Sequence, residues 1–410
     1  MTNACRYCSQ PLTLSVADLG ATPLANSYLP VSEEAKAAER SYPLHVMVCQ
    51  SCRLTQTTET VPADAIFDHD YAYLSSYSAS WVAHAQRYAE AMTQRFDLGP
   101  DSLVTEVASN DGYLLQHFVG AGIPVLGIEP AGHAAALAEK KGVRSRVAFF
   151  NEATARELVA EGFRADLMAG NNVLAHVPDI RDFAAGFPVV LKPGGVLTFE
   201  FPHLLNLIDQ IQFDTIYHEH YSYLSLLFVE RLLDGVGMRV FDVEELPTHG
   251  GSLRIFACHK DADHLAMPGL QKVRVDESNA ALDTDAPYAA FGARIESVCQ
   301  GFRSFLAEAV AEGKTVAAYG AAAKGNTFLN VCKVGNDKIA FVVDRNPEKQ
   351  DRLLPGSHIP VHDTDELKER QPDYVVILPW NLAAEISEQH AYIADWGGKF
   401  VIAVPEIRVL

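Results

Sequence analysis

The chain has 410 residues, of which 48% are hydrophobic and 21% charged, and this composition predicts two to four ordinary globular domains. Its formal net charge of −19 argues against a nucleic-acid partner, because nucleic-acid binding needs a basic surface. No apolar stretch is long enough to span a membrane and the N-terminus lacks the apolar core of a signal peptide, so we expect a cytoplasmic protein.

Two cysteine pairs, Cys5-x-x-Cys8 and Cys49-x-x-Cys52, predict a zinc-binding module and substrate-capping segment within residues 1–80. A gap of two residues lets both thiolates of a pair reach one metal ion, and two such pairs complete a tetrahedral zinc site. Four thiolate ligands leave no open coordination position, so the zinc would be structural. The forty residues between the pairs exceed the usual length in a zinc ribbon, and two redox pairs or unrelated thiols are the alternatives.

Residues 81–260 predict a doubly wound α/β domain. A helix at 81–95 precedes a strand at 102–107, a tight turn, a helix and a second strand at 125–128 that ends in Glu129. This order of strand, turn, helix, strand and acid places a carboxylate where it can bind a ribose diol.

The turn after the first of these strands has a single glycine, Gly112, instead of a full G-x-G-x-x-G. One glycine argues against a pyrophosphate close to the helix N-terminus and suits S-adenosylmethionine, which carries no phosphate. Glu106 would lie near the methionine amine and Glu129 would bind the ribose, although capping of a loop is the alternative for Glu129. The expected cofactor-binding residues are Glu106, Ser109, Asn110, Gly112, Glu129 and Asn171.

Strands at 165–169 and 195–200 continue the domain, and a Leu-Lys-Pro-Gly-Gly turn typical of class I methyltransferases precedes the second. Ligands of open α/β sheets bind at the carboxyl ends of strands, so Asn171 and His176 are expected to face the site. A lone histidine is more often structural, and only its position favours a role for His176. An antiparallel hairpin within 238–257 then closes the sheet.

Residues 216–223 read Ile-Tyr-His-Glu-His-Tyr-Ser-Tyr and form the most informative run of the chain. Such a polar cluster is costly to bury, because every polar group needs a partner. Its phenols, imidazoles and carboxylate can move protons or stabilise an oxyanion. The run therefore predicts a centre for proton abstraction, with a polar helix face or a second metal site as the alternatives.

Residues 261–410 predict a second Rossmann-like domain. A polar stretch at 261–286 suggests a linker or lid, and a helix follows it. Apolar strands then alternate with helices, at 315–319, 339–343, 374–378 and 400–404.

Small residues before Lys324 would let backbone amides approach phosphates at a positive helix end, where NAD or a sugar nucleotide could bind. The two lysines of this region would add charge, while an aspartate and an asparagine could bind hydroxyl groups. A solvated surface charge is the alternative for each lysine, above all for Lys349. The expected substrate-binding residues are Lys324, Asn326, Asp344, Asn346 and Lys349.

The order of these motifs resembles the zinc-containing sugar C-methyltransferases of antibiotic deoxysugar pathways, over essentially the whole chain. It looks closest to the C-3'-methyltransferases that act on dTDP-linked 4-keto deoxysugars on the route to tetronitrose. The resemblance implies S-adenosylmethionine in the middle domain and a thymidine nucleotide held largely by the C-terminal domain, with a monomer as the working expectation. It assigns to the active site the residues Tyr71, His176, Tyr217, Glu219 and His220.

A C–H bond beside a C4 ketone can lose its proton if the enolate is stabilised, and the carbanion can then take a methyl group. His220 is the expected base, because the ordinary histidine pKa of about 6.5 lies near working pH. Glu219 could orient a histidine, and Tyr217 or His176 could donate a hydrogen bond to the enolate oxygen. The expected substrate carries a C3 amino group. The alternatives are methylation at C5 or of another nucleotide sugar, an NAD-dependent sugar-nucleotide oxidoreductase, and a zinc-ribbon nucleic-acid-binding protein.

Overall fold

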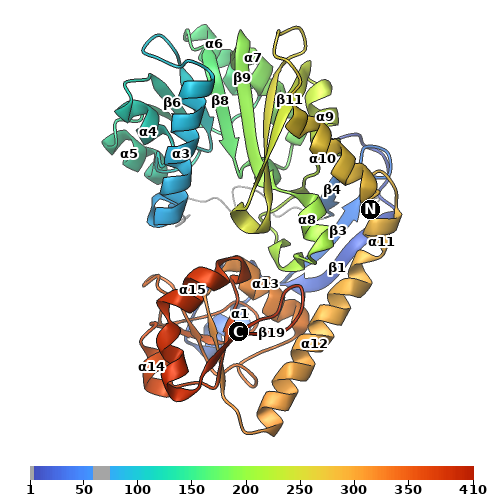
Figure 1. The fold of residues 1–410 in the computed structure, drawn as a ribbon, viewed down its shortest axis with the longest axis vertical. Helices are drawn as coiled ribbons and strands as arrows, with labels where there is room; N and C mark the ends of the chain where they lie inside the picture. Colours follow the sequence, from blue (N-terminus) through green and yellow to red (C-terminus); the bar gives the residue numbers. More distant parts are fainter. Residues whose placement is uncertain (1–3, 59–73) are drawn as a thin grey trace.

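The computed structural model describes residues 4–58 and 74–410, and within these ranges the strands form three sheets of four, seven and eight strands. Figure 1 shows the seven-stranded sheet with its helices in the upper half and the C-terminal domain in the lower half, with the N-terminal strands at their junction. The long helix α12 (Phe291–Ala311) runs along one side toward the lower domain. The predicted α/β class with three parts is confirmed.

The N-terminal sheet is antiparallel and contains β1 (Leu14–Thr22), β3 (Tyr42–Val48) and β4 (Thr55–Thr57). Its fourth strand, β10 (Ser222–Tyr223), comes from the end of the predicted reaction run. The backbone of that run is therefore part of the sheet that carries the cysteine pairs.

The central sheet has the order β11-β12-β9-β8-β5-β6-β7. Strands β5 to β9 run parallel, and β11 and β12 form the predicted antiparallel hairpin at one edge. The predicted turn before β9 is instead the start of that strand, which pairs with β8 across a register shift. The strands are β5 (Val104–Val107), β6 (Val125–Ile128), β7 (Ser145–Arg146), β8 (Ala165–Asn171), β9 (Leu191–Pro202), β11 (Met238–Leu246) and β12 (Ser252–His259).

Helices pack on both faces of this sheet through apolar side chains. On one face the rings of Phe187 and Phe199 lie 4.9 Å apart and join a helix to β9. On the other, Tyr88 contacts Phe118. The helices are α3 (Ala79–Arg95), α4 (Leu115–Gly120), α5 (Gly132–Lys140), α6 (Glu152–Ala160), α7 (Ile180–Val190), α8 (Leu204–Asp209) and α9 (Leu226–Asp234), with the 3-10 turns η1 (Ser75–Tyr77), η2 (Leu174–His176), η3 (Phe213–Thr215) and η4 (Thr248–Gly250).

The prediction of a linker or lid at 261–286 is wrong. Helix α10 (Pro268–Asn279) occupies its centre and buries Leu270 and Val273 against the methyltransferase domain. The buried Glu277 accepts hydrogen bonds from the backbone amides of Leu226 and Leu227 at the start of α9, at 2.6 and 2.8 Å. The polar composition of this segment suggested an exposed linker, because the sequence does not show that the Glu277 side chain is buried and caps the start of another helix.

The C-terminal sheet has the order β19-β18-β17-β13-β14-β16-β15-β2, with parallel strands at its centre. Strand β2 (Leu29–Pro30) comes from the N-terminal region and pairs with β15, so the chain passes early from the cysteine module to this domain. The other strands are β13 (Val316–Tyr319), β14 (Val342–Val343), β15 (Arg352–Leu353), β16 (Pro360–His362), β17 (Tyr374–Ile377), β18 (Lys399–Ile402) and β19 (Arg408–Val409).

The helices of this domain include α13, which begins where the phosphate-binding turn was predicted. They are α1 (Glu33–Ala38), α13 (Ala323–Cys332), α14 (Glu366–Arg370) and α15 (Ala383–Gln389), with η5 (Trp380–Leu382) and η6 (Ala391–Trp396). The short helix α11 (Ala286–Ala289) lies instead beside β1, before α12. In the described part of the chain, no helix is both long and apolar enough to cross a membrane.

Candidate functional site

The four predicted zinc ligands converge. The Sγ atoms of Cys5, Cys8, Cys49 and Cys52 lie within 4.8 Å of one another, and tetrahedral zinc with bonds of about 2.3 Å would place them about 3.8 Å apart. Both pairs have the same local geometry: the first cysteine accepts a hydrogen bond from the amide four residues later and donates to the carbonyl five residues later. Two matching turns with converging thiols fit the predicted structural zinc.

The cysteine module also supports the predicted reaction run. Arg6, between the two cysteines of the first pair, donates hydrogen bonds to the Tyr221 carbonyl and to the Ser222 hydroxyl, the latter at 3.0 Å. Tyr221 donates its own backbone amide to the Ala175 carbonyl at 2.8 Å. The run is thus fixed between the cysteine module and η2.

The predicted cofactor turn lies between β5 and α4. Its backbone is tight, because Ala108, Asn110 and Gly112 all have positive φ angles, of 58°, 49° and 75°. A Cβ atom on Gly112 would lie 3.0 Å from the Cβ of Ala138, so only glycine fits there. Ser109 packs under β6, where a Cβ on Gly127 would lie 2.4 Å from its Oγ, so its contribution to a ligand would come from the backbone.

Glu129 at the end of β6 caps the cofactor loop. Its two carboxylate oxygens accept hydrogen bonds from the backbone amides of Asn110 and Ala131, at 2.9 and 2.8 Å. Loop capping, the alternative considered from the sequence, is therefore present. A carboxylate oxygen can accept a second hydrogen bond, so ribose binding by Glu129 stays a prediction.

Glu106 on β5 is 0% exposed, and burial raises its pKa well above the usual range; the negative charges of Glu129 and Asp111 raise it further. Among the described residues, neither carboxylate oxygen of Glu106 has a hydrogen-bond partner, and neither does Oδ1 of Asn171 at the end of β8; the Tyr113 phenol lies close to both groups. An ammonium group would supply the missing positive charge, and S-adenosylmethionine carries one in its methionine part. The residues present fit the predicted cofactor.

The structure brings His176, Tyr217 and His220 together. The ring centroids of His220 lie 4.0 Å from those of Tyr217 and 4.7 Å from those of His176. The Nδ1 atom of His220 lies 2.9 Å from the Thr215 carbonyl oxygen, which can only accept a hydrogen bond. Neutral His220 therefore carries its proton on Nδ1 and keeps a lone pair on Nε2.

Both histidines are neutral at neutral pH. Burial lowers the pKa of His176 to about 4, and a hydrogen bond to the Glu219 backbone opposes this effect. Burial lowers the pKa of His220 well below its usual value, and the nearby His176 opposes a positive charge on His220 when it is itself protonated. Lys324 contributes to the same decrease, so its charge acts on the reaction run from the C-terminal domain.

Glu219 precedes His220 in the run and is 7% exposed, and burial raises the pKa of its carboxyl group. The Asn26 side chain donates a hydrogen bond to its Oε1 at 2.6 Å. His218 instead points inward, with its Nε2 3.1 Å from the Tyr42 carbonyl oxygen. The run thus contains both a structural side chain, His218, and side chains of the candidate site.

Lys324 at the start of α13 is half-buried. Its Nζ donates to Asn381 at 2.7 Å and lies 4.9 Å from the centre of the Trp380 ring. Burial lowers the pKa of Lys324, and the charge of Asp214, just before the reaction run, opposes this effect. Lys324 is therefore a cation whose charge acts on His220.

The other predicted substrate residues mostly serve the loop around Ala321. Lys349 donates to the Ala321 carbonyl at 2.7 Å, so the surface-charge alternative for Lys349 is wrong. Asp344 accepts from the backbone amides of Ala321 and Asn346, at 2.7 and 2.8 Å. Asn326 is buried and donates to the Ala25 carbonyl at 2.6 Å.

Tyr71, the remaining predicted residue, lies outside the described residues. The sequence reasoning missed Asn26, which no local pattern marks, and His249, which has a positive φ of 55°. Burial lowers the pKa of His249 to about 4, and its Nε2 lies 3.3 Å from the Asn172 amide nitrogen. A Thr-His-Gly-Gly sequence was the available signal for this strained turn.

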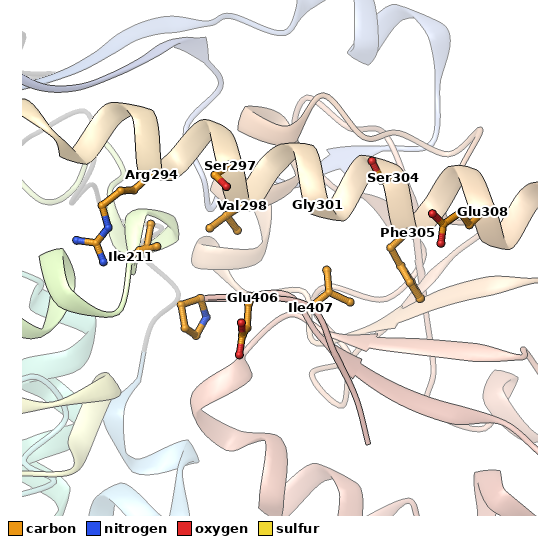
Figure 2. Close-up of a pocket in the computed structure, with 11 residues that line it drawn as sticks. Ile211, Arg294, Ser297, Val298, Gly301, Ser304, Phe305, Glu308, Glu406 and Ile407 are labelled. Atoms are coloured by element: carbon orange, nitrogen blue, oxygen red, sulfur yellow. The ribbon is translucent and has the colours of Figure 1, made fainter.

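A groove of about 560 Å³ lies elsewhere, between α12 and the C-terminal tail. Figure 2 shows side chains such as Val298 and Phe305 of α12 facing Ile407 across it. Arg294 at one end is already engaged by the Ile208 and Asp209 carbonyls. None of the predicted site residues lines this groove.

Comparison with known families gives three successive matches along the chain. A zinc binding domain matches residues 5–67, a methyltransferase domain matches 81–243, and a C-methyltransferase C-terminal domain matches 247–405.

Two curated proteins are similar to the chain. The C-methyltransferase NovU of Streptomyces niveus is 36% identical over 406 residues, which cover 99% of this chain and 96% of NovU. A ubiquinone biosynthesis O-methyltransferase of Rhodopseudomonas palustris (strain BisA53) is 25% identical over 157 residues, 33% of this chain and 62% of that protein.

Among solved structures, an S-adenosylmethionine-dependent methyltransferase from Clostridium acetobutylicum aligns with a TM-score of 0.36 and 12% identity, over 43% of this chain and 92% of its own. The relationship to NovU, in contrast, extends from the cysteine module through the C-terminal domain. The chain therefore belongs to the zinc-binding C-methyltransferase family and is an S-adenosylmethionine-dependent C-methyltransferase.

Proposed function

We propose that the protein methylates C3 of a dTDP-linked 4-keto deoxysugar that carries a C3 amino group, as in the route to tetronitrose. The observation that carries this proposal is the position of His220. Its Nδ1 proton is committed to the Thr215 carbonyl, so its Nε2 lone pair is available beside His176 and Tyr217.

His220 acts as the base in this proposal. Its lowered pKa keeps it neutral at neutral pH but makes it a weak proton acceptor. A nucleotide diphosphate near Lys324 would add negative charge to the site and raise the pKa of His220 again. The substrate would thereby increase the basicity of the residue that deprotonates it.

Glu219 is the second candidate base, because burial raises the pKa of its carboxyl group toward neutrality. Its orientation is restricted, since Asn26 occupies one of its oxygens at 2.6 Å and only 7% of its surface is exposed. The half-buried His220 is the more accessible of the two, so we assign proton removal to His220 and an orienting role to Glu219.

The enolate oxygen needs a hydrogen-bond donor. Tyr217 carries a phenol whose ring contacts the His220 ring, whereas the single N–H group of neutral His176 is donated to the Glu219 backbone. A donor at this oxygen stabilises the charge that develops when C3 loses its proton. We assign this role to Tyr217, and His176 packs against the base, His220.

Methyl transfer completes the reaction. The C3 proton moves to Nε2 of His220, the C–H electron pair becomes the enolate, and C3 then forms its new carbon–carbon bond. When bound, S-adenosylmethionine would supply the methyl group, and its sulfonium would become a neutral thioether. Glu106, Tyr113 and Asn171 would hold its methionine part at the carboxyl ends of β5 and β8.

For the C-terminal domain we propose nucleotide binding at the start of α13, with Lys324 contacting the diphosphate. The half-buried Lys324 charge acts on both His220 and His249, which supports a position between nucleotide and sugar. Lys349 and Asp344 would act indirectly, by shaping the Ala321 loop.

Incubation of the protein with S-adenosylmethionine and a panel of dTDP-linked 4-keto sugars tests this function. We expect a mass increase of one methylene unit, with the new methyl group at C3 and the highest rate for the 3-amino sugar. A product methylated at C5, or on another nucleotide sugar only, would replace the proposed substrate. A nicotinamide absorbance change with the same sugars, without methyl transfer, would favour the oxidoreductase alternative.

A further inference from the structure

Asn26 connects the N-terminal region to the proposed reaction centre. It lies in the loop between β1 and β2, 193 positions before Glu219, and its Nδ2 donates to Glu219 Oε1 at 2.6 Å. An amide nitrogen can only donate, so this contact suits a carboxylate acceptor. The loop thus delivers one directed hydrogen bond to the buried carboxyl group of the residue that precedes His220.

The C-terminal domain holds the same loop in place. The buried Asn326 donates to the Ala25 carbonyl at 2.6 Å, and the Tyr28 hydroxyl donates to the Ala321 carbonyl at 2.5 Å. Asn326 lies two residues after Lys324 on α13. The loop residues 25–28 therefore contact Glu219 on one side and the proposed nucleotide-binding turn on the other.

We propose that Asn26 is a positioning residue for methyl transfer, which holds the Glu219 carboxylate in its working orientation and links that orientation to helix α13. This inference rests on the proposed function, because it takes Glu219 to be part of the reaction centre. A free Glu219 side chain would sample several rotamers and would leave its working orientation for part of the time.

The surroundings of Glu219 make this hydrogen bond important. Burial raises the pKa of its carboxyl group and the Asn26 hydrogen bond opposes this rise, because it stabilises the charged form. Tyr28 faces the group from the same loop, His176 bonds its backbone from η2, and His218 and His220 flank it in the run. Loss of the Asn26 amide should therefore favour protonation of Glu219.

The first experiment measures the titration of Glu219 directly. Infrared difference spectra of the full zinc-loaded chain, with the Glu219 band assigned through Glu219→Gln, give the midpoint of its protonation. Asn26→Ala should raise this midpoint by about one pH unit, a tenfold increase in proton affinity. Ser27→Ala, an exposed change in the same loop, is the control that should leave it in place. An unchanged midpoint in correctly folded, zinc-containing Asn26→Ala would overturn the proposal.

The second experiment measures turnover. Asn26→Ala should lower kcat about 10- to 100-fold and change KM for the keto sugar less than about twofold, since a charge-assisted hydrogen bond contributes roughly 1.5–3 kcal/mol. A higher KM with unchanged kcat would show a substrate contact and overturn the positioning role. If wild-type protein methylates none of the keto sugars, the proposed function fails, while the infrared midpoint still decides whether Asn26 controls Glu219.

Discussion

Arg6, between the first two cysteines, donates a hydrogen bond to the backbone carbonyl of Tyr221, the residue that directly follows His220. The cysteine module is therefore joined to the reaction run by a side chain whose position depends on the folded first cysteine turn. A zinc ion with four cysteine ligands has no open position for catalysis, but through this contact it could hold the reaction run in place. The metal would act through the backbone of residues 220–222.

Arg6→Ala should reduce methyl transfer while the protein keeps its zinc. The change removes a charge-assisted hydrogen bond from the Tyr221 carbonyl, which keeps the Thr57 amide as a donor at 3.1 Å. The loss costs about 1.5–3 kcal/mol and loosens the segment after His220. Arg53→Ala is the matched control, because Arg53 in the second cysteine turn bonds Asp285 instead of the run. Metal analysis and initial rates check this prediction. Equal rates in both variants would contradict a link through Arg6.

Glu106→Gln should weaken S-adenosylmethionine binding about 10- to 100-fold. A neutral amide cannot form the charge-assisted contact with the methionine ammonium, which contributes roughly 1.5–3 kcal/mol. Calorimetric titration measures the affinity without any sugar substrate. Glu139→Gln removes the same charge from an exposed position on α5 and should bind normally. If Glu106→Gln binds S-adenosylmethionine with wild-type affinity, the methionine amine of the cofactor does not lie near Glu106 on β5.

Lys324→Met should change the pH dependence of the reaction. In the wild type, the pKa of His220 is lowered by burial and by neighbouring charges, Lys324 among them, so kcat/KM should stay high at pH 6.5 and decrease only at lower pH as His220 gains a proton. Removal of the Lys324 charge raises the pKa of His220, and the decrease should begin at higher pH.

The same variant should raise KM for the nucleotide sugar about tenfold, through the loss of a charged phosphate contact. Lys333→Met, at the exposed far end of α13, removes an equal charge and serves as the control. If kcat/KM of the variant decreases at the same acidic pH as in the wild type and KM is also unchanged, Lys324 does not belong to the site.

Gly112→Ala should destabilise the methyltransferase domain more than Gly122→Ala. Both glycines have φ of 75°, and alanine costs about 1–2 kcal/mol in that region. Only Gly112 also faces a close neighbour, with Ala138 Cβ 3.0 Å from an added Cβ. Thermal unfolding of both variants, with and without S-adenosylmethionine, separates the cost of the positive φ angle from the cost of the close contact with Ala138. Equal losses would show that the cofactor turn has room for a side chain.

Much of this fold could be predicted from local patterns. Apolar strands that end in acids marked β5 and β6, and the spacing of Cys5, Cys8, Cys49 and Cys52 marked a metal site that the folded turns bring within 4.8 Å. The Tyr217-to-His220 run could be recognised as a candidate site, because its polar groups are costly to bury.

Long-range pairings could not be predicted in this way. The contact between Asn26 and Glu219 joins positions 193 residues apart, and β2 pairs with β15 across most of the chain. Local sequence fixes neither, because both depend on how three domains pack together. Helix α10 was missed for a local reason. Its polar residues suggested an exposed linker, but the buried Glu277 accepts hydrogen bonds from two backbone amides at the start of α9.

Solvent exchange at the sugar tests the central claim most directly. The protein, the S-adenosylmethionine analogue S-adenosylhomocysteine and a dTDP-linked 4-keto sugar are incubated in D2O, and deuterium at C3 is measured by mass spectrometry. Wild-type protein should exchange the C3 proton, and His220→Asn should lose both exchange and methyl transfer while binding S-adenosylmethionine with unchanged affinity. Exchange at the wild-type rate in His220→Asn would contradict the assignment of His220 as the base.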